Sequence, residues 1–162
     1  MFLMSWARTT RRGSAGFTLI ELMVVVAIVA ILVAIAVPMY LQHVQTVARS
    51  EAEGELLNAA NHMEQLYASQ MTYANATVTT ATSQGTIAGW APSNGSASDA
   101  KYILSFASGS PTASSYTLMA SATSLQTKGS FQEVIELNNQ GQHCIKQSSS
   151  VSSCSFGVDP SW

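Results

Sequence analysis

The feature that most constrains this chain is an apolar run near its N-terminus. Sixteen consecutive residues, Leu22 to Val37, are apolar and uncharged. Extended back to Phe17, the run gives about 21 helical residues, which at a rise of 1.5 Å per residue is enough to cross the hydrocarbon of a bilayer. One acid, Glu21, lies near its start. We therefore expect a membrane-spanning helix that carries a carboxylate.

Basic and small residues come before this run. Three arginines precede the tetrapeptide Gly13-Ser14-Ala15-Gly16. An ordinary secretory signal has its small-residue cleavage site after the apolar core, whereas here the small residues come first. Cleavage after the core, at Ala34-Ile35-Ala36, is an alternative that would release a soluble domain starting near Val37. The arginines predict a cytoplasmic N-terminal end and an exported C-terminal body.

The stretch GFTLIELMVVVAIVAILVAIAVPMY, residues 16–40, resembles the N-terminal signature of the type IV pilin family. Gly16, Phe17, Glu21 and Pro38 all fall in register with that signature. The resemblance implies that residues 1–16 are a leader peptide. It also implies that a prepilin peptidase cuts between Gly16 and Phe17 and methylates the new amine, as in the type IVa subgroup.

Glu21 needs a physical explanation, because a carboxylate at the centre of a membrane helix costs about 2.5–3.5 kcal/mol on insertion scales. It lies four residues after Phe17, on the same face of a helix. Its partner is either the amine of its own chain or that of a neighbouring subunit, and the family resemblance implies the neighbour. The pairing would then set the axial register of a filament. The alternative is an acid that snorkels to the interface.

Pro38 marks a change of pattern. It removes one backbone hydrogen bond, which predicts a kink or local opening of the helix. Beyond it, apolar residues recur at steps of three and four, as on one face of an α-helix. We expect one helix from about Thr18 to Ser69, with a hydrophobic segment 17–38 and an amphipathic segment 39–73. The expected buried stripe is Leu41, Val44, Ala48, Ala52, Leu56, Ala59, Met63 and Leu66.

The remainder, residues 74–162, is predicted to form a connecting loop and a sheet. Residues 74–100 are rich in Ala, Ser, Thr and Gly, which is typical of an irregular loop, with Trp90 as a packing residue. Strand-like alternation follows in 101–107, 115–122, 131–138 and 142–146, with a hairpin turn at 138–141. We expect an α+β fold in which the long helix packs on an antiparallel meander of about four strands.

Two cysteines, Cys144 and Cys154, lie in a serine-rich C-terminal segment with nine residues between them. In an exported protein, such a pair predicts a disulfide. The alternative is a metal pair with His143, for which the sequence shows no evident fourth ligand. Trp162 either caps the edge of the sheet or is frayed.

The charge balance and the sequence motifs limit the functions that the chain can have. Only 10% of the residues are charged, and residues 17–162 carry four basic against nine acidic side chains, a net charge of −5. Nucleic acid is therefore an unlikely partner by electrostatics alone. No nucleophile, metal or phosphate-binding motif is present, so we predict no enzymatic activity, no cofactor and no metal site.

The body carries the segments ARSEAEGELLNAANHMEQLYASQMTY, YILSF, YTLMASATSLQ and IELNNQGQ, between residues 48 and 142. With these segments, nearly the whole mature chain is similar to PilE-type minor pilins. The implied function is a minor subunit of a bacterial type IV pilus, supporting filament assembly, twitching motility and adhesion. The implied partners are other pilin subunits, the prepilin peptidase, the inner-membrane assembly machinery and the membrane itself. The implied localisation is the inner membrane before assembly and the extracellular pilus afterwards.

Three competing functions are kept. A type II secretion pseudopilin would bind calcium through C-terminal acids, for which Asp159, Glu133 and Glu136 are available. A competence pilin that takes up DNA would need a basic strip, and Lys101, Lys128 and Lys146 are few. A secreted enzyme would begin near Val37.

Overall fold

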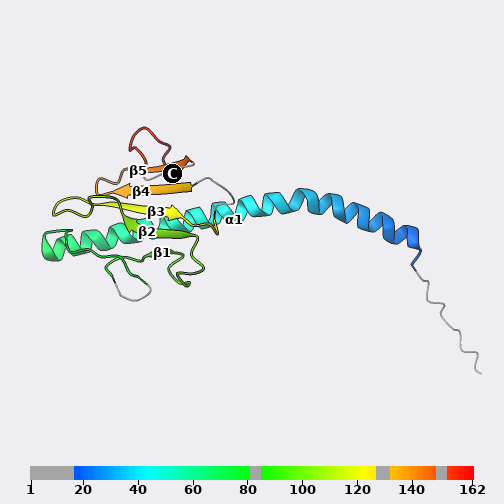
Figure 1. Cartoon of the computed structure of the whole chain (residues 1–162), viewed down its shortest axis with the longest axis horizontal. Helices are drawn as coiled ribbons and strands as arrows, with labels where there is room; N and C mark the ends of the chain where they lie inside the picture. Colours follow the sequence, from blue (N-terminus) through cyan, green and yellow to red (C-terminus); the bar gives the residue numbers. More distant parts are fainter. Residues whose placement is uncertain (1–16, 81–84, 127–131, 149–152) are drawn as a thin grey trace, which may run out of the picture. The chain divides into compact units, whose positions relative to one another are not determined.

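The computed structural model describes residues 17–80, 85–126, 132–148 and 153–162 (Figure 1). One helix is followed by five strands that form a single antiparallel sheet in chain order. The elements are α1 (Leu19–Gln70), β1 (Trp90–Ala91), β2 (Tyr102–Phe106), β3 (Thr117–Ala122), β4 (Gln132–Asn138) and β5 (His143–Ser148). The chain divides into an N-terminal unit that ends at Leu41 and a globular unit, Gln42–Trp162.

The α+β fold predicted from the sequence is confirmed, with one more strand than expected. The additional strand is β1, which lies inside the segment 74–100 that was expected to be an irregular loop. Its two residues pair with Ile103 and Tyr102 of β2. A strand of two residues has no alternating pattern of its own, so only its partner on β2 defines it.

Helix α1 ends within one residue of the predicted position. Met71 takes the left-handed conformation, with φ 55°, and its N–H donates to the carbonyl of Tyr67 at 2.7 Å. This geometry closes the last turn of the helix. No glycine is present at this position to mark the C-terminus of the helix. The sequence predicts that terminus only from the residue at which the periodic pattern ends.

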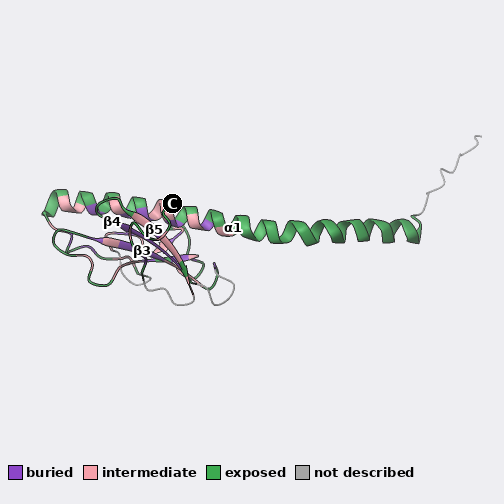
Figure 2. Cartoon of the chain, turned by 90° about the horizontal axis from the view of Figure 1, so that it is seen from above, coloured by how far each residue is buried: buried purple, intermediate pink, exposed green. Residues whose placement is uncertain are grey.

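The amphipathic stripe of α1 covers the sheet (Figure 2). Five of the eight predicted positions are buried: Ala48, Ala52, Leu56, Ala59 and Met63. Leu66 is partly buried against the same core. Leu41 and Val44 are exposed, so the prediction was wrong for these two positions. Periodicity identifies the apolar face of a helix. It does not show how much of that face is covered by the rest of the same chain.

The face of the sheet toward α1 holds the core. Tyr102 and Leu104 of β2, Leu118 and Ala120 of β3, and Ile135 and Leu137 of β4 are all buried in one cluster with the helix stripe. The register places these residues in directly opposed pairs, such as Leu104 with Ala120 and Ala120 with Ile135. The predicted hairpin between β4 and β5 is confirmed, with Gly141 at φ 74° in its turn.

Strand β4 is buried on both faces. Residues 133–137 are all buried, whereas a strand with one solvated face would alternate. The face away from α1 is covered near β4 by the chain at Cys154, whose N–H donates to the Glu136 carboxylate. The disulfide of Cys154 to Cys144 on β5 joins the C-terminal segment 153–162 to the sheet. The cover is remote in sequence from β4, so the local pattern of β4 does not reveal it.

The same segment closes the outer edge of β5. The N–H of Ile145 donates to the carbonyl of Pro160 at 2.6 Å. A ring nitrogen of His143 lies 2.8 Å from the carbonyl oxygen of Trp162, and the two rings are in contact with centroids 4.4 Å apart. Of the two alternatives for Trp162, the structure selects the cap on the sheet edge.

Candidate functional site

The described part of the N-terminal unit presents an extended apolar surface. All described residues from Phe17 to Leu41 are exposed, as the green first half of α1 in Figure 2 shows. Within α1 an 18-residue window reaches a mean hydropathy of 3.1, which by length and composition is sufficient to cross a membrane. Exposed apolar surface of this extent marks contact with lipid or with another protein.

Glu21 occupies the first turn of α1. The Thr18 hydroxyl accepts the backbone N–H of Glu21 at 3.2 Å, and the Thr18 carbonyl accepts the N–H of Leu22 at 3.2 Å. Thr18 is therefore the N-cap, and Glu21 is the third helical residue. Thr-x-x-Glu is the sequence of a capping box, and a carboxylate at this position also interacts favourably with the positive end of the helix dipole. This local role is readable in the sequence but was missed.

The other predicted processing residues lie at the boundary of the described chain. Phe17 is described and is 81% exposed. Gly16 and the whole predicted leader, residues 1–16, lie outside the described residues. Helix α1 runs without interruption through Pro38, so the kink or local opening there stays a prediction.

A polar network connects α1 to the sheet in the globular unit. Both nitrogens Nε and Nη2 of Arg49 donate to the carboxylate of Glu133, the first at 2.8 Å. The same carboxylate accepts the hydroxyl of Tyr102 and the amide of Gln147. Burial by itself raises the pKa of Glu133, but the hydrogen bonds from Arg49, Tyr102 and Gln147 together bring that pKa below its ordinary value. Glu133 is thus held ionised as a structural group.

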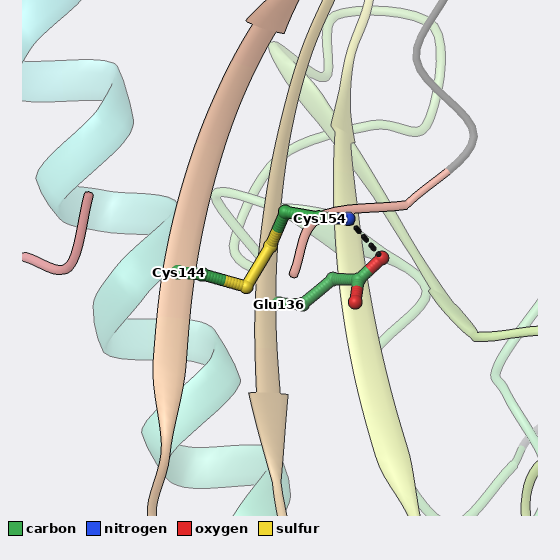
Figure 3. Close-up of side chains that lie close together, drawn as sticks. All are labelled: Glu136, Cys144 and Cys154. Carbon is green, nitrogen blue, oxygen red and sulfur yellow. Dashed lines mark hydrogen bonds between the residues drawn. A yellow bond between two sulfur atoms is a disulfide. The ribbon is translucent and has the colours of Figure 1, made fainter. Parts of the chain in front are cut away.

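Glu136 lies on the opposite face of β4, beneath the disulfide. Figure 3 shows its carboxylate pointing toward the backbone of Cys154, whose N–H it accepts at 3.3 Å. Burial raises the pKa of Glu136, the Cys154 N–H lowers it, and the nearby charge of Asp159 raises it again, so the net direction is upward. Asp159 itself accepts the N–H of Ser155 and lies 3.6 Å from the Lys146 ammonium.

The three acids considered as calcium ligands are therefore engaged separately. Glu133 faces α1, Glu136 faces the disulfide, and Asp159 lies with Lys146. Within the described part of the chain, the one group of metal-ligand side chains that lie together is Glu136 with the two cysteines, and these cysteines are joined in the disulfide. The alternative of a metal pair with His143 is not what the structure shows, because His143 contacts Trp162.

The combination of an uncovered apolar helix and a body built as helix on meander defines the class of type IV pilins. Comparison with known families identifies the subfamily of pilins. The family described as "Type IV minor pilin ComP, DNA uptake sequence receptor" matches residues 38–133, and "Prokaryotic N-terminal methylation motif" matches residues 11–37. The first match spans more than half of the chain, which therefore belongs to this family of type IV minor pilins.

Among solved structures, the chain is similar to the crystal structure of the Neisseria meningitidis non-core minor pilin PilV. The sequence identity is 16%, the similarity covers 68% of this chain and 94% of that chain, and the TM-score is 0.48. The predicted minor pilin of a type IV pilus, carrying an N-methylation motif, is confirmed by the family matches. Pilins are structural proteins that assemble with other pilin subunits.

Proposed function

We propose that this minor pilin is made as a precursor whose leader, residues 1–16, is removed by a prepilin peptidase between Gly16 and Phe17, with methylation of the Phe17 amine. The match to the N-terminal methylation motif over residues 11–37 supports this proposal most directly. The helix geometry is compatible with it. Phe17 lies ahead of the Thr18 cap, so its backbone nitrogen stands outside the helix and is exposed to an enzyme.

Glu21 then serves assembly. It is the one formally charged side chain in the sequence from Phe17 to Ala48, and it is exposed at the helix start. The cap and the helix dipole offer it only partial charge, equivalent to roughly half an elementary charge. In lipid or in a dry filament interior, an ionised carboxylate needs a full counterion. The methylated amine of a neighbouring subunit supplies one, and a subunit in the wrong axial register leaves both charges unpaired.

The N-terminal end stays cytoplasmic and the globular unit is exported, in line with the three arginines that precede the apolar run. The subunit waits in the inner membrane as a single-pass protein and is then extracted by the pilus assembly machinery into the filament. The filament in turn provides twitching motility and adhesion. The role is structural, without enzymatic activity.

The test is the intact mass and N-terminal sequence of the protein recovered from sheared surface filaments. We expect a chain that begins at Phe17 and carries the mass of one added methyl group. A matched Gly16→Leu variant should keep its leader and be missing from the filaments. A mature start near Val37, or an unmethylated chain that retains residues 1–16 in filaments, would contradict the proposal.

A second candidate function is DNA uptake, favoured by the description of the matching family as a DNA uptake sequence receptor. The charges of the globular unit limit how it could work. Among the described residues, Arg49 is paired with Glu133 and Lys146 with Asp159, which leaves Lys101 as the cation without an ion pair. Binding would then depend on polar contacts to bases more than on phosphate charge.

Gel-shift titration of the full chain in detergent micelles tests this second function. Each phosphate contact contributes a slope of about −0.9 in log K against log salt. We expect a shallow slope, no steeper than about −3.6, if the four cations of the mature chain are the whole electrostatic contribution. Absence of any shift at low salt rejects DNA uptake and leaves the assembly function in place.

A further inference from the structure

A groove of about 660 Å³ runs along the globular unit on one side of α1. One wall is a face of the helix, and the other is the chain segment that leads into β1. Its volume falls in the range of about 300–1,000 Å³ that is usual for small-ligand sites. Neither the disulfide segment nor the N-terminal unit contributes to it, so it is independent of the assembly surface.

The helix wall carries a row of polar side chains. Asn58, Asn61, His62 and Gln65 all line the groove and are all exposed. They are spaced three, four and seven residues apart, so all four lie on the same side of the helix, on successive turns. None of the four side chains forms a hydrogen bond with the described part of the chain, so their donors and acceptors are open to a ligand.

The opposite wall is formed by residues 79, 85–90 and 93, and two of its glycines pack closely against the backbone of residues 78–79. A Cβ atom at Gly85 would lie 2.3 Å from the carbonyl carbon of Val78, and one at Gly89 would lie 1.9 Å from the carbonyl oxygen of Thr79. Both positions therefore require glycine. The indole of Trp90 completes this wall, and its Nε1–H donates to the carbonyl of Gly95 at 3.1 Å. That bond ties the aromatic ring to the loop that carries it.

The charge of the lining selects the class of ligand. No lysine or arginine lines the groove, which disfavours phosphate, sulfate, sialic acid and nucleic acid. Glu55 is the one acid there, and it is engaged by the N–H of Ser93 at 3.2 Å and by the Ser93 hydroxyl. An apolar peptide is also disfavoured, because its side chains would bury the open amides of the helix wall without partners.

We propose that this groove binds a short neutral oligosaccharide. A primary amide offers two donors and an acceptor, which suits the adjacent hydroxyl groups of a sugar, each a donor and an acceptor. Asn58 and Gln65 lie about 10 Å apart along the helix at 1.5 Å per residue, enough for more than one sugar ring. The Trp90 indole supplies a flat apolar surface for the C–H face of a sugar.

The inference deepens the adhesive role proposed above and rests on it for its biological use, but the binding itself does not depend on filament assembly. The experiment uses the full chain, purified in a zwitterionic detergent without a sugar headgroup. It is applied to a printed array of neutral, sialylated and sulfated glycans and then titrated with lactose, N-acetyllactosamine and chitotriose by calorimetry. We expect retention on neutral glycans and none on the sialylated or sulfated ones.

Two variants locate the site. Asn58→Ala and Gln65→Ala each remove hydrogen bonds worth about 0.5–1.5 kcal/mol, which corresponds to a loss of affinity of about two- to twelvefold. Both side chains are exposed, so the melting temperature should not fall. The matched control is Gln140→Ala, an exposed amide in the β4–β5 turn outside the groove, which should bind as the wild type does.

The outcomes separate cleanly. No retention of any neutral glycan by the wild-type chain overturns the proposal, and so does binding that Asn58→Ala and Gln65→Ala leave unchanged. Retention on sialylated or sulfated glycans alone also overturns it, since the groove lacks cations. Filament incorporation and N-terminal processing are measured separately. Failure of either rejects the assembly function and does not affect the conclusion on glycan binding.

Discussion

The two halves of α1 obey opposite rules although they form one continuous helix. From Phe17 to Leu41 each residue is exposed and nearly all are apolar, whereas between Gln42 and Gln70 a stripe of apolar residues from Ala48 to Met63 is buried (Figure 2). The second half satisfies its apolar surface within the chain. The first half can satisfy its surface only in lipid or against other subunits. The C-terminal half of the helix thus contributes to folding of the chain, and the N-terminal half is left for contacts outside it.

Charge follows the same division. The globular half of α1 pairs its Arg49 within the chain, with Glu133 on β4. In the N-terminal half, Glu21 has no charged residue near it along the helix, since residues 22–48 hold no formal charge. An ion pair completed inside the fold stabilises that fold, whereas a charge left open can select a neighbour.

The largest expected effect concerns Glu21. Glu21→Gln keeps the shape and the capping acceptor but removes the charge, so the register pairing is lost. We expect incorporation into sheared filaments, measured by immunoblot against the whole-cell amount, to fall by about tenfold or more, the equivalent of at least ~1.4 kcal/mol per subunit. Glu51→Gln, an exposed acid in the globular half, is the control and should incorporate normally.

The next effect compares two leucines on the same helix. Leu56 is 0% exposed and Leu32 is 61% exposed. Leu56→Ala should lower the free energy of unfolding by about 3 kcal/mol, because it leaves a cavity in the core, and Leu32→Ala should change it by about zero. Unfolding of the full chain in detergent, followed by tryptophan fluorescence, measures both. Equal losses at the two positions would mean that the division of α1 is wrong.

The disulfide should contribute somewhat less. Cys144 and Cys154 close a loop with a sequence separation of 10, for which chain entropy gives about 2–3 kcal/mol. The double variant Cys144→Ser/Cys154→Ser should lose that amount of stability and become sensitive to proteolysis in residues 153–162. Filament incorporation should persist, since the N-terminal half is untouched. A variant as stable and as protease-resistant as the wild type would show that the edge contacts hold the segment by themselves.

The smallest effect is the dependence of stability on pH. The pKa of Glu133 is below its ordinary value of 4.5, so its contribution is present above that pH and is lost as the pH falls through the lower folded pKa. Glu133→Gln should therefore be less stable than the wild type at neutral pH, with a gap that narrows in acid. Thermal melts at a series of pH values measure the gap, and a constant gap would contradict the assignment.

Glu136 should show the opposite sign. Its pKa is raised, so the folded state prefers the protonated acid and loses stability as the pH rises through that pKa. Glu136→Gln mimics the protonated form and keeps an acceptor for the Cys154 N–H. It should be at least as stable as the wild type at neutral pH and equal to it in acid. A clear loss at neutral pH would show that the charge itself is needed there.

Much of this fold could be predicted from local patterns. The stripe from Ala48 to Met63, the four longer strands and the β4–β5 turn are each encoded by residues within a few positions of one another, and so is the N-terminal signature. What could not be predicted depends on distant segments. Two-residue β1 is defined by β2, and the double burial of β4 is defined by the segment 153–162. Glu133 and Glu136 appeared as candidate ligands because a sequence cannot show which face each acid occupies.

The seal of the β5 edge by Pro160 and Trp162 has a consequence for a protein whose purpose is to polymerise. An open strand edge invites other sheets to join it without limit, through backbone hydrogen bonds that ignore side-chain identity. Along β5 that route is closed by the chain itself. Association with other subunits is then left to the exposed apolar segment, residues 17–41, in which Glu21 is the one formally charged side chain of the sequence.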